Sequence, residues 1–546
     1  MAECAASLVR ELESEATQNA TNASKINARA TPRSGRSRLA MYCLGELARL
    51  PPSAGRASAL GDAGVAASFE TLARDAFETR SEKKSGKESH AQTHAKHGDE
   101  SFVTPAAFAL GGACAGLECR ARFLPFVVAG VADAADARAE YAFLVATREA
   151  IFSASRDDIA DGFLAVTSTD SRTDDAQPAQ TKSSSSFFTR SETSSLVEAL
   201  LAAAERTKEE GARAVIAECL GRLASRETFN VDDDDAAENE NAKEGLGLMA
   251  RLRADVCDAR LGPGRRATAM AAAKHAVLHG ETRGLRTALI YDALPGFVNF
   301  ETLGAATDAT TRLAATRCLS AVAHAEPAAV ASRRATSWIG AIAPALFAQT
   351  PVDKTLVRVV DLGPFKHTVD DGLETRKAAF ECLATLLDAF RVAANAKAAD
   401  AEETGDFLDA APPGFANGVA TAASLGAGDH YDVKIVAHAL ICALVKSRLG
   451  LEAARGVLPE TCAAFKATLT AKLKSDAVKQ EQDRAADLAR SCLRAVAALR
   501  AKLGEGHAER HPEFAAFVDE VVMTEKHAKA FEDARAAAAE EDGVAA

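Results

Sequence analysis

Aromatic residues are scarce in this chain of 546 residues, which contains one tryptophan and four tyrosines. Alanine supplies much of the apolar fraction, and this balance favours close packing of helices over a β-sandwich. The chain also lacks any run of about 18 uninterrupted apolar residues, so no segment is predicted to span a membrane. The composition therefore predicts a helical protein without a membrane-spanning segment.

Basic residues do not predominate, because 64 lysines and arginines are outnumbered by 76 acidic residues and the formal net charge is -12. A polyanion would be repelled on balance, which argues against nucleic acid as a partner. The N-terminal segment lacks the basic start and apolar block of a secretory signal, and its acids at Glu3, Glu11, Glu13 and Glu15 are unlike a transit peptide. We expect the protein in the cytoplasm and the nucleus.

The motifs of common catalytic and cofactor sites are missing. The sequence contains no glycine-rich phosphate loop, no nucleophile elbow, and no Cys-x-x-Cys pair among its eleven cysteines. His90, His94 and His97 have a spacing that could bind a metal on a helix, but they lie in a polar stretch without a fourth ligand. We therefore predict no enzymatic activity, no metal and no cofactor.

A recurring segment is the strongest pattern in the sequence. Each copy begins with a basic residue, continues with small residues and with apolar residues three and four apart, and ends on leucine or valine. The clearest copies are Arg38–Leu47, Arg213–Leu223, Arg312–Val322 and Arg376–Leu386. Their spacing indicates a helix-pair repeat of about 40 residues with insertions. Because one pair cannot bury its own apolar stripe, the pairs are expected to stack into an all-α solenoid of the HEAT or armadillo type.

One helix illustrates the stripe that such stacking requires. The residues that fall on a single face at the 3.6-residue period are Ala379, Cys382, Leu383, Leu386, Leu387 and Phe390. We interpret them as core. Four polar or low-complexity stretches interrupt the repeats, and their composition predicts disordered loops. These stretches are 77–101, 167–195, 231–244 and 393–416.

A β-hairpin is predicted at 356–371, where the helical rhythm breaks. Leu356–Leu362 is rich in β-branched residues, Gly363 and Pro364 form a turn signal, and Phe365–Val369 alternates large and polar side chains. The residues alone leave two roles open. The hairpin is either a packing staple between helices or a finger that projects from the solenoid.

Two helix N-termini are predicted, one after the hairpin and one after residues 429–432. Asp371 is expected to cap the helix after the hairpin, with Glu374 returning the bond as in a capping box. The cluster Asp429-His430-Tyr431-Asp432 has the residue types of a catalytic group. It immediately precedes a repeat helix, however, so Asp429 or Asp432 is expected to be an N-cap or first-turn residue that complements the helix dipole.

Several of these segments resemble one known family. The segments that carry the resemblance are Gly363–Cys382, Asp429–Lys434, Ser475–Glu481 and Arg494–Leu499. They are similar to the C-terminal region of the cullin-associated, neddylation-dissociated proteins, also called the TATA-binding-protein-interacting family. They include turn and loop residues that repeat packing alone would not dictate.

The resemblance implies a non-catalytic scaffold, and it also implies the order of its domains and the identity of its partners. The expected domains are a repeat solenoid over 1–334, a family-type HEAT domain with the hairpin over 335–503, and a C-terminal helix with an acidic tail over 504–546. The implied partner is an unneddylated cullin with its RING subunit. The family competes there with the substrate-receptor adaptor and so promotes receptor exchange on cullin-RING ubiquitin ligases.

The resemblance also favours the finger over the staple. In the family, the hairpin of the C-terminal repeats projects into the docking site of the adaptor. The partner-binding residues that this implies are Val359, Leu362, Gly363, Pro364, Phe365, Lys366, His367 and Val369. The chain matches only the second half of the family pattern. A separate chain is therefore expected to supply the N-terminal repeats, or else the sequence is truncated.

Two other functions stay open at this stage. A generic HEAT-repeat scaffold, such as a transport receptor or a phosphatase subunit, would bind its cargo and no cullin. The alternative family name also suggests binding to a basal transcription factor, since an acidic surface could meet a basic protein.

Overall fold

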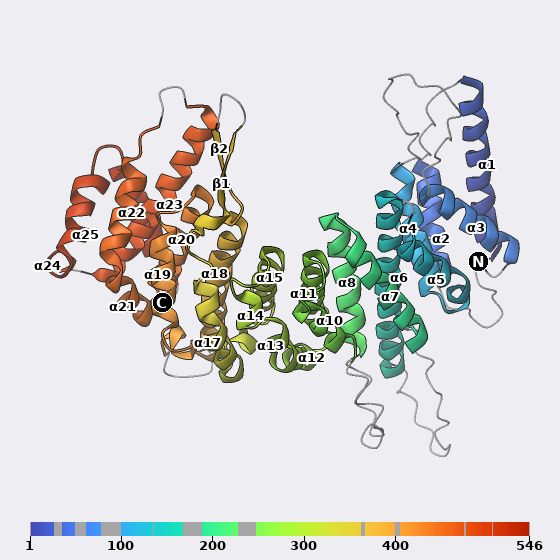
Figure 1. Cartoon of the computed structure of the whole chain (residues 1–546), viewed down its shortest axis with the longest axis horizontal. Helices are drawn as coiled ribbons and strands as arrows, with labels where there is room; N and C mark the ends of the chain where they lie inside the picture. The colour runs from blue at the N-terminus through green and yellow to red at the C-terminus, as the bar shows by residue number, and fades with distance from the viewer. Residues whose placement is uncertain are drawn as a thin grey trace, which may run out of the picture. The chain divides into compact units, whose positions relative to one another are not determined.

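A computed structural model describes most of the chain. The described residues are 2–26, 35–49, 60, 62–77, 100–134, 136–167, 188–227, 247–361, 366–398, 405–473, 477–504 and 506–544. They divide into two compact units, Met1–Glu238 and Asn239–Ala546. In both units pairs of helices stack in two layers, which confirms the predicted all-α solenoid (Figure 1). Among the described helices, none has both the length and the apolar character to cross a bilayer.

The described residues of the first unit form four helix pairs. Its helices are α1 (Ala2–Ile26), α2 (Gly35–Arg49), α3 (Ala63–Phe77), α4 (Glu100–Ala115), α5 (Leu117–Ala132), α6 (Ala137–Thr167), α7 (Arg190–Arg206) and α8 (Glu210–Glu227). The second helix of each pair packs on the next, in the order α2, α4, α6, α8. Small residues make this approach possible, because a Cβ atom added at Gly45 of α2 would lie 2.6 Å from Ala109 Cα of α4.

The second unit contains the longer array. Its first part comprises α10 (Leu248–Cys257), α11 (Pro263–Leu278), α12 (Arg283–Ala288), η3 (Leu289–Ala293), α13 (Leu294–Phe297), α14 (Phe300–Leu303), α15 (Ala309–Ala325), α16 (Pro327–Val330), α17 (Arg333–Phe347) and η4 (Lys354–Leu356). The remainder comprises α18 (Leu373–Ala398), η5 (Phe407–Ala410), α19 (Phe415–Gly426), α20 (Tyr431–Leu444), α21 (Arg448–Gly456), α22 (Leu458–Thr470), α23 (Lys479–Leu503), α24 (His507–Arg510), α25 (Pro512–Phe517), η6 (Val518–Val522) and α26 (Ala528–Val544).

One layer of this unit is a continuous row of helices. In this row α11, α15, α18, α20, α23 and α26 each pack on the next, while α17, α19, α22 and α25 follow one another in the other layer. The four clear repeat segments of the sequence lie in α2, α8, α15 and α18, which are all second helices of their pairs. The predicted stripe of α18 is buried at every position, from Ala379 to Phe390. The contact between successive repeats therefore forms the hydrophobic core, as the periodicity predicted.

The predicted hairpin is present between α17 and α18. Strand β1 (Val357–Asp361) pairs antiparallel with β2 (Lys366–Asp370), and the register runs from Val357 opposite Asp370 to Asp361 opposite Lys366. Figure 1 shows the two strands rising above α15 and α18, to about the level that the upper end of α23 reaches in this view. They form the only sheet in the described part of the chain.

The disorder predicted for the interruptions is wrong where the structure describes them. Residues 393–398 continue α18, and 405–416 contain η5 and the start of α19. Residues 190–195 begin α7, where Thr189 and Glu192 form a capping box. The stretch 231–244 and most of 77–101 and 167–195 lie outside the described residues, as do His90, His94 and His97. Within the described part, no group of three metal-ligating side chains is found.

The error over 393–416 has a physical cause in Asp406. Its carboxylate accepts hydrogen bonds from Ser447 Oγ at 2.6 Å and from the backbone N–H groups of Leu408 and Leu449 at 2.9 and 3.1 Å. Burial alone would raise the pKa of Asp406, but these hydrogen bonds outweigh it and lower the pKa. The segment is ordered by a contact about 40 residues further along the chain, which local composition cannot reveal.

A buried histidine in α20 predicts a measurable pH dependence. His438 is 0% exposed, its Nδ1 lies 3.2 Å from Ser491 Oγ, and its ring packs against Phe465. Burial, aided by the charge of Lys434, lowers the pKa of His438 to about 4. In the unfolded chain His438 is therefore protonated below about pH 6.5, whereas in the folded chain it stays neutral down to about pH 4. The free energy of unfolding falls as the pH drops through this window.

Replacing His438 with asparagine should remove this pH-dependent loss of unfolding free energy. The amide keeps a hydrogen-bonding group near Ser491 but does not titrate. Between pH 7 and pH 5 we expect wild-type protein to lose about 2 kcal/mol more unfolding free energy than His438→Asn. Urea titrations at both pH values measure the difference, and groups common to both proteins cancel. Equal losses in the two proteins would show that His438 is not held neutral by the fold.

Candidate partner-binding site

The structure describes four of the eight predicted partner-binding residues, and all four are in the strands. Val359 lies in β1, and Lys366, His367 and Val369 lie in β2. The side chain of Val359 is 63% exposed, His367 is exposed, and Val369 is half-buried. The other four predicted partner-binding residues, Leu362, Gly363, Pro364 and Phe365, lie outside the described residues, so their contribution stays a prediction.

The register distributes these residues over both faces of the hairpin. Residues directly opposite each other in an antiparallel pair point to the same face, and neighbours along a strand point to opposite faces. Val359 therefore shares one face with Thr368, while His367 and Val369 share the other with Val360 and Arg358. Val359 and Thr368 are both exposed, whereas Val360 and Val369 are half-buried. The hairpin thus offers an open apolar contact on the face of Val359.

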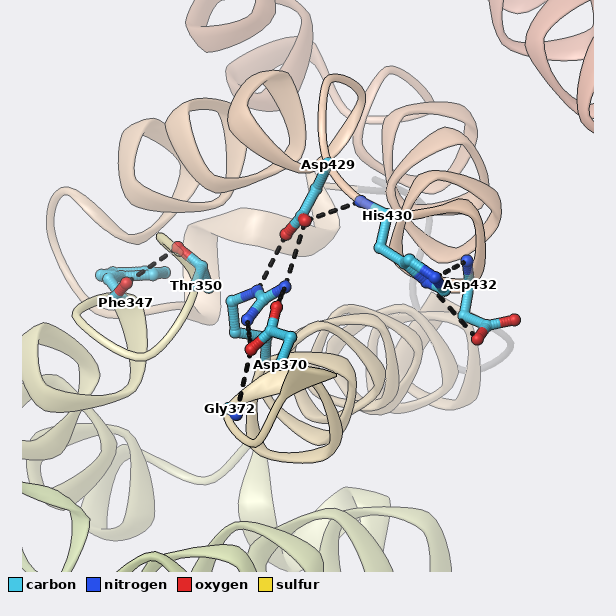
Figure 2. A network of polar contacts seen from close by, with 8 residues as sticks. Phe347, Thr350, Asp370, Gly372, Asp429, His430 and Asp432 are labelled. Atoms are coloured by element: carbon cyan, nitrogen blue, oxygen red, sulfur yellow. Dashed lines mark hydrogen bonds and ion pairs between the residues drawn. The ribbon is translucent and has the colours of Figure 1, made fainter. Parts of the chain in front are cut away.

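A buried arginine connects the base of the hairpin to a neighbouring repeat. The guanidinium of Arg376, in the first turn of α18, donates to Asp370 Oδ2 at 2.8 Å and to Asp370 Oδ1 at 3.2 Å. It also donates to Asp429 Oδ2 at 2.9 Å and to Asp429 Oδ1 at 3.1 Å. Figure 2 shows Asp370 and Asp429 approaching one another from two different segments. We refer to Arg376, Asp370 and Asp429 as the arginine clamp.

Burial makes the arginine clamp stronger than a surface ion pair. The side chain of Arg376 is 3% exposed and that of Asp429 is 8% exposed. Hydrogen bonds from Arg376 lower the pKa of Asp370. Burial alone would lower the pKa of Arg376, but its bonds to Asp370 and Asp429 outweigh burial and raise it. Removing one partner from a buried, hydrogen-bonded group of charges is strongly destabilising, because the remaining charge is then buried and unpaired.

The chain around Asp371 differs from the predicted capping box. Asp371 pairs with Arg358, whose Nε lies 2.8 Å from Asp371 Oδ2, and Glu374 pairs instead with Arg317. The N–H of Gly372 is bound by Asp370 Oδ1 at 3.0 Å. The described contacts of Asp371 and Glu374 therefore include neither bond of a capping box, because each carboxylate faces an arginine on another segment.

The cluster at the start of α20 has structural roles. His430 is the N-cap and accepts a hydrogen bond from the N–H of Asp432, which lies in the first turn as predicted. Asp429 is not the cap, because its carboxylate binds Arg376 (Figure 2). The sequence predicted Arg376 only as the basic first residue of a repeat segment. The available signal was that Asp370, Arg376 and Asp429 lie in two of the segments that resemble the family.

The fold and the site together define a class of protein. The chain is an α-solenoid of HEAT type whose C-terminal part carries one hairpin, fixed at its base by buried charges. Among solved structures it is similar to importin-β crystallised in ammonium sulfate, with 12% identity and a TM-score of 0.46 over 92% of this chain and 55% of that one.

Sequence comparisons find proteins of the kind that the resemblance implies. Residues 335–522 match the family described as TATA-binding protein interacting (TIP20). The chain is 33% identical over 293 residues to cullin-associated NEDD8-dissociated protein 1 of Arabidopsis thaliana, covering 54% of this chain and 20% of that protein. It is 28% identical over 405 residues to cullin-associated NEDD8-dissociated protein 2 of Rattus norvegicus, covering 73% and 25%. The predicted family resemblance is thereby confirmed, and the chain spans a quarter or less of the length of these relatives.

Proposed function

We propose that this chain is a non-catalytic scaffold that binds an unneddylated cullin together with its RING subunit. The relatives are named for association with cullins, and the family match over 335–522 includes the hairpin and the arginine clamp. The observation that carries the proposal is the hairpin, which rises above α18 (Figure 1) and leaves Val359 63% exposed on one face. A few anchor side chains that fill pockets on the partner supply most of the energy of an interface, and Val359 is exposed for such a contact.

The mechanism we propose is steric competition. The stacked helices give a long surface over which binding energy can be distributed, and the hairpin occupies the surface where the substrate-receptor adaptor would dock. The two proteins then exclude each other, and the adaptor with its receptor is released and exchanged. The chain spans a quarter or less of its relatives, and whether a separate chain or a longer form of this one supplies further repeats is left open in the proposal.

Direct binding tests the first part of this proposal. Full-length chain immobilised on a biosensor should bind an unneddylated cullin–RING complex with a Kd of about 1 μM or tighter, the range of a specific interface of ordinary size. A basic transcription factor and a nuclear transport cargo serve as negative partners, because a generic scaffold would bind these and ignore the cullin. Binding to either negative partner without binding to the cullin would contradict the proposal.

A further inference from the structure

The hairpin needs support from outside its own strands. An isolated two-stranded hairpin is marginally stable in water, and its direction is free to vary unless its base is held. Within the described residues, the main packing of β1 is against β2, and no helix packs extensively on either strand. The direction of the hairpin is therefore decided where the strands join the helices.

The arginine clamp lies at that junction. Asp370 is the last residue of β2, Arg376 is in the first turn of α18, and Asp429 precedes α20. One guanidinium therefore joins the strand end, its own repeat and the next repeat (Figure 2). Because α18 is packed between α15 and α20, Arg376 is anchored in the core of the unit. A rotation of the hairpin about its base would have to break hydrogen bonds that water cannot easily replace.

The other ion pair at the hairpin base is much weaker. Arg358 and Asp371 are 61% and 49% exposed, and exposed pairs of this kind contribute little. Arginine is also essential to the geometry of the clamp, since its planar fork binds two carboxylates at fixed angles. A lysine would present one ammonium group without that directionality.

We propose that Arg376 is a positioning residue that fixes the direction of the hairpin relative to α20. Its role in adaptor displacement rests on the proposed function. A hairpin whose direction is already fixed binds its target without the entropic cost of ordering. The positioning itself does not depend on any partner and can be measured on the free chain.

The test compares hairpin orientation in matched variants. Bio-orthogonal spin labels at Thr368 of β2 and Ala439 of α20, both exposed, avoid the exposed native cysteines Cys4, Cys43 and Cys257. Double electron–electron resonance should give one narrow distance distribution in wild-type protein. Arg376→Lys should lose the narrow peak. Arg391→Lys is the control, because it makes the same change in the same helix at an exposed ion pair.

A second variant covers the case in which Arg376→Lys fails to fold. Asp429→Asn keeps the side-chain shape and leaves Arg376 bound to Asp370, and it should also broaden the distribution. In adaptor competition both variants should weaken displacement about three- to tenfold while cullin binding is kept.

Three results would overturn part of the account, and they are distinguishable. Unchanged distance distributions in both clamp variants overturn the positioning role. Broadened distributions with undiminished displacement overturn its link to competition. Failure of wild-type protein to bind a cullin overturns the proposed function and leaves the positioning role intact.

Discussion

Replacing Phe380 with alanine should lower the free energy of unfolding of the second unit by about 3–5 kcal/mol. Phe380 is 0% exposed in α18, and its ring reaches α19, where a Cβ atom added at Gly426 would lie 2.6 Å from Phe380 Cζ. The facing residues Gly426 and Ala437 are too small to fill the space that the ring would leave. The variant therefore loses apolar burial and also retains a cavity.

The measurement can use the single tryptophan of the chain. Trp338 lies in α17 and donates its indole N–H to the carbonyl oxygen of Val298 at 2.8 Å, so its fluorescence reports on the second unit during a urea titration. Val392→Ala is the matched control, since this side chain is 39% exposed in the same helix and its loss should cost within about 0.5 kcal/mol. A Phe380→Ala variant as stable as this control would contradict the packing of α18 against its neighbours.

The solenoid and the hairpin could be predicted because their determinants are local. The stripe from Ala379 to Phe390 is a 3.6-residue period within one helix, and it is buried at every position. The hairpin is marked by β-branched residues on either side of Gly363 and Pro364, which also requires only a short window. Such patterns depend little on where the rest of the chain lies.

The arginine clamp could not be predicted in the same way. Arg376 and Asp429 are 53 residues apart, and they meet only because α18 and α20 stack in one layer. A local role as an N-cap or first-turn residue is all that the sequence predicts for Asp429, since a single sequence reveals only local partners. The predicted capping role of Asp371 is wrong for the same reason, because its partner Arg358 lies across the hairpin.

The second large effect concerns the hairpin itself. Replacing Val359, Phe365 and His367 together with alanine should leave cullin binding within about threefold of wild type but weaken adaptor displacement at least thirtyfold, or about 2 kcal/mol, as expected for anchor residues. Val359 and His367 are exposed on opposite faces of the strands, so truncating them removes contacts without opening the core. Phe365 is included because the family resemblance implies that it is a partner-binding residue.

A control variant separates this effect from a general loss of surface contacts. Lys529, Asp533 and Arg535 are exposed on α26, at the end of the helical row remote from α18, and their replacement with alanine should leave displacement unchanged. Circular dichroism and Trp338 fluorescence should be the same for all three proteins.

The most direct measurement is release of a fluorescent adaptor from a preassembled, unneddylated cullin–RING–adaptor complex on addition of this chain. Wild-type protein and the α26 variant are predicted to release the adaptor, and the hairpin variant is predicted to bind the cullin without releasing it. Equal release by the hairpin variant, or no release by wild-type protein that binds the cullin, would contradict the central claim that the clamped hairpin competes for the adaptor's place.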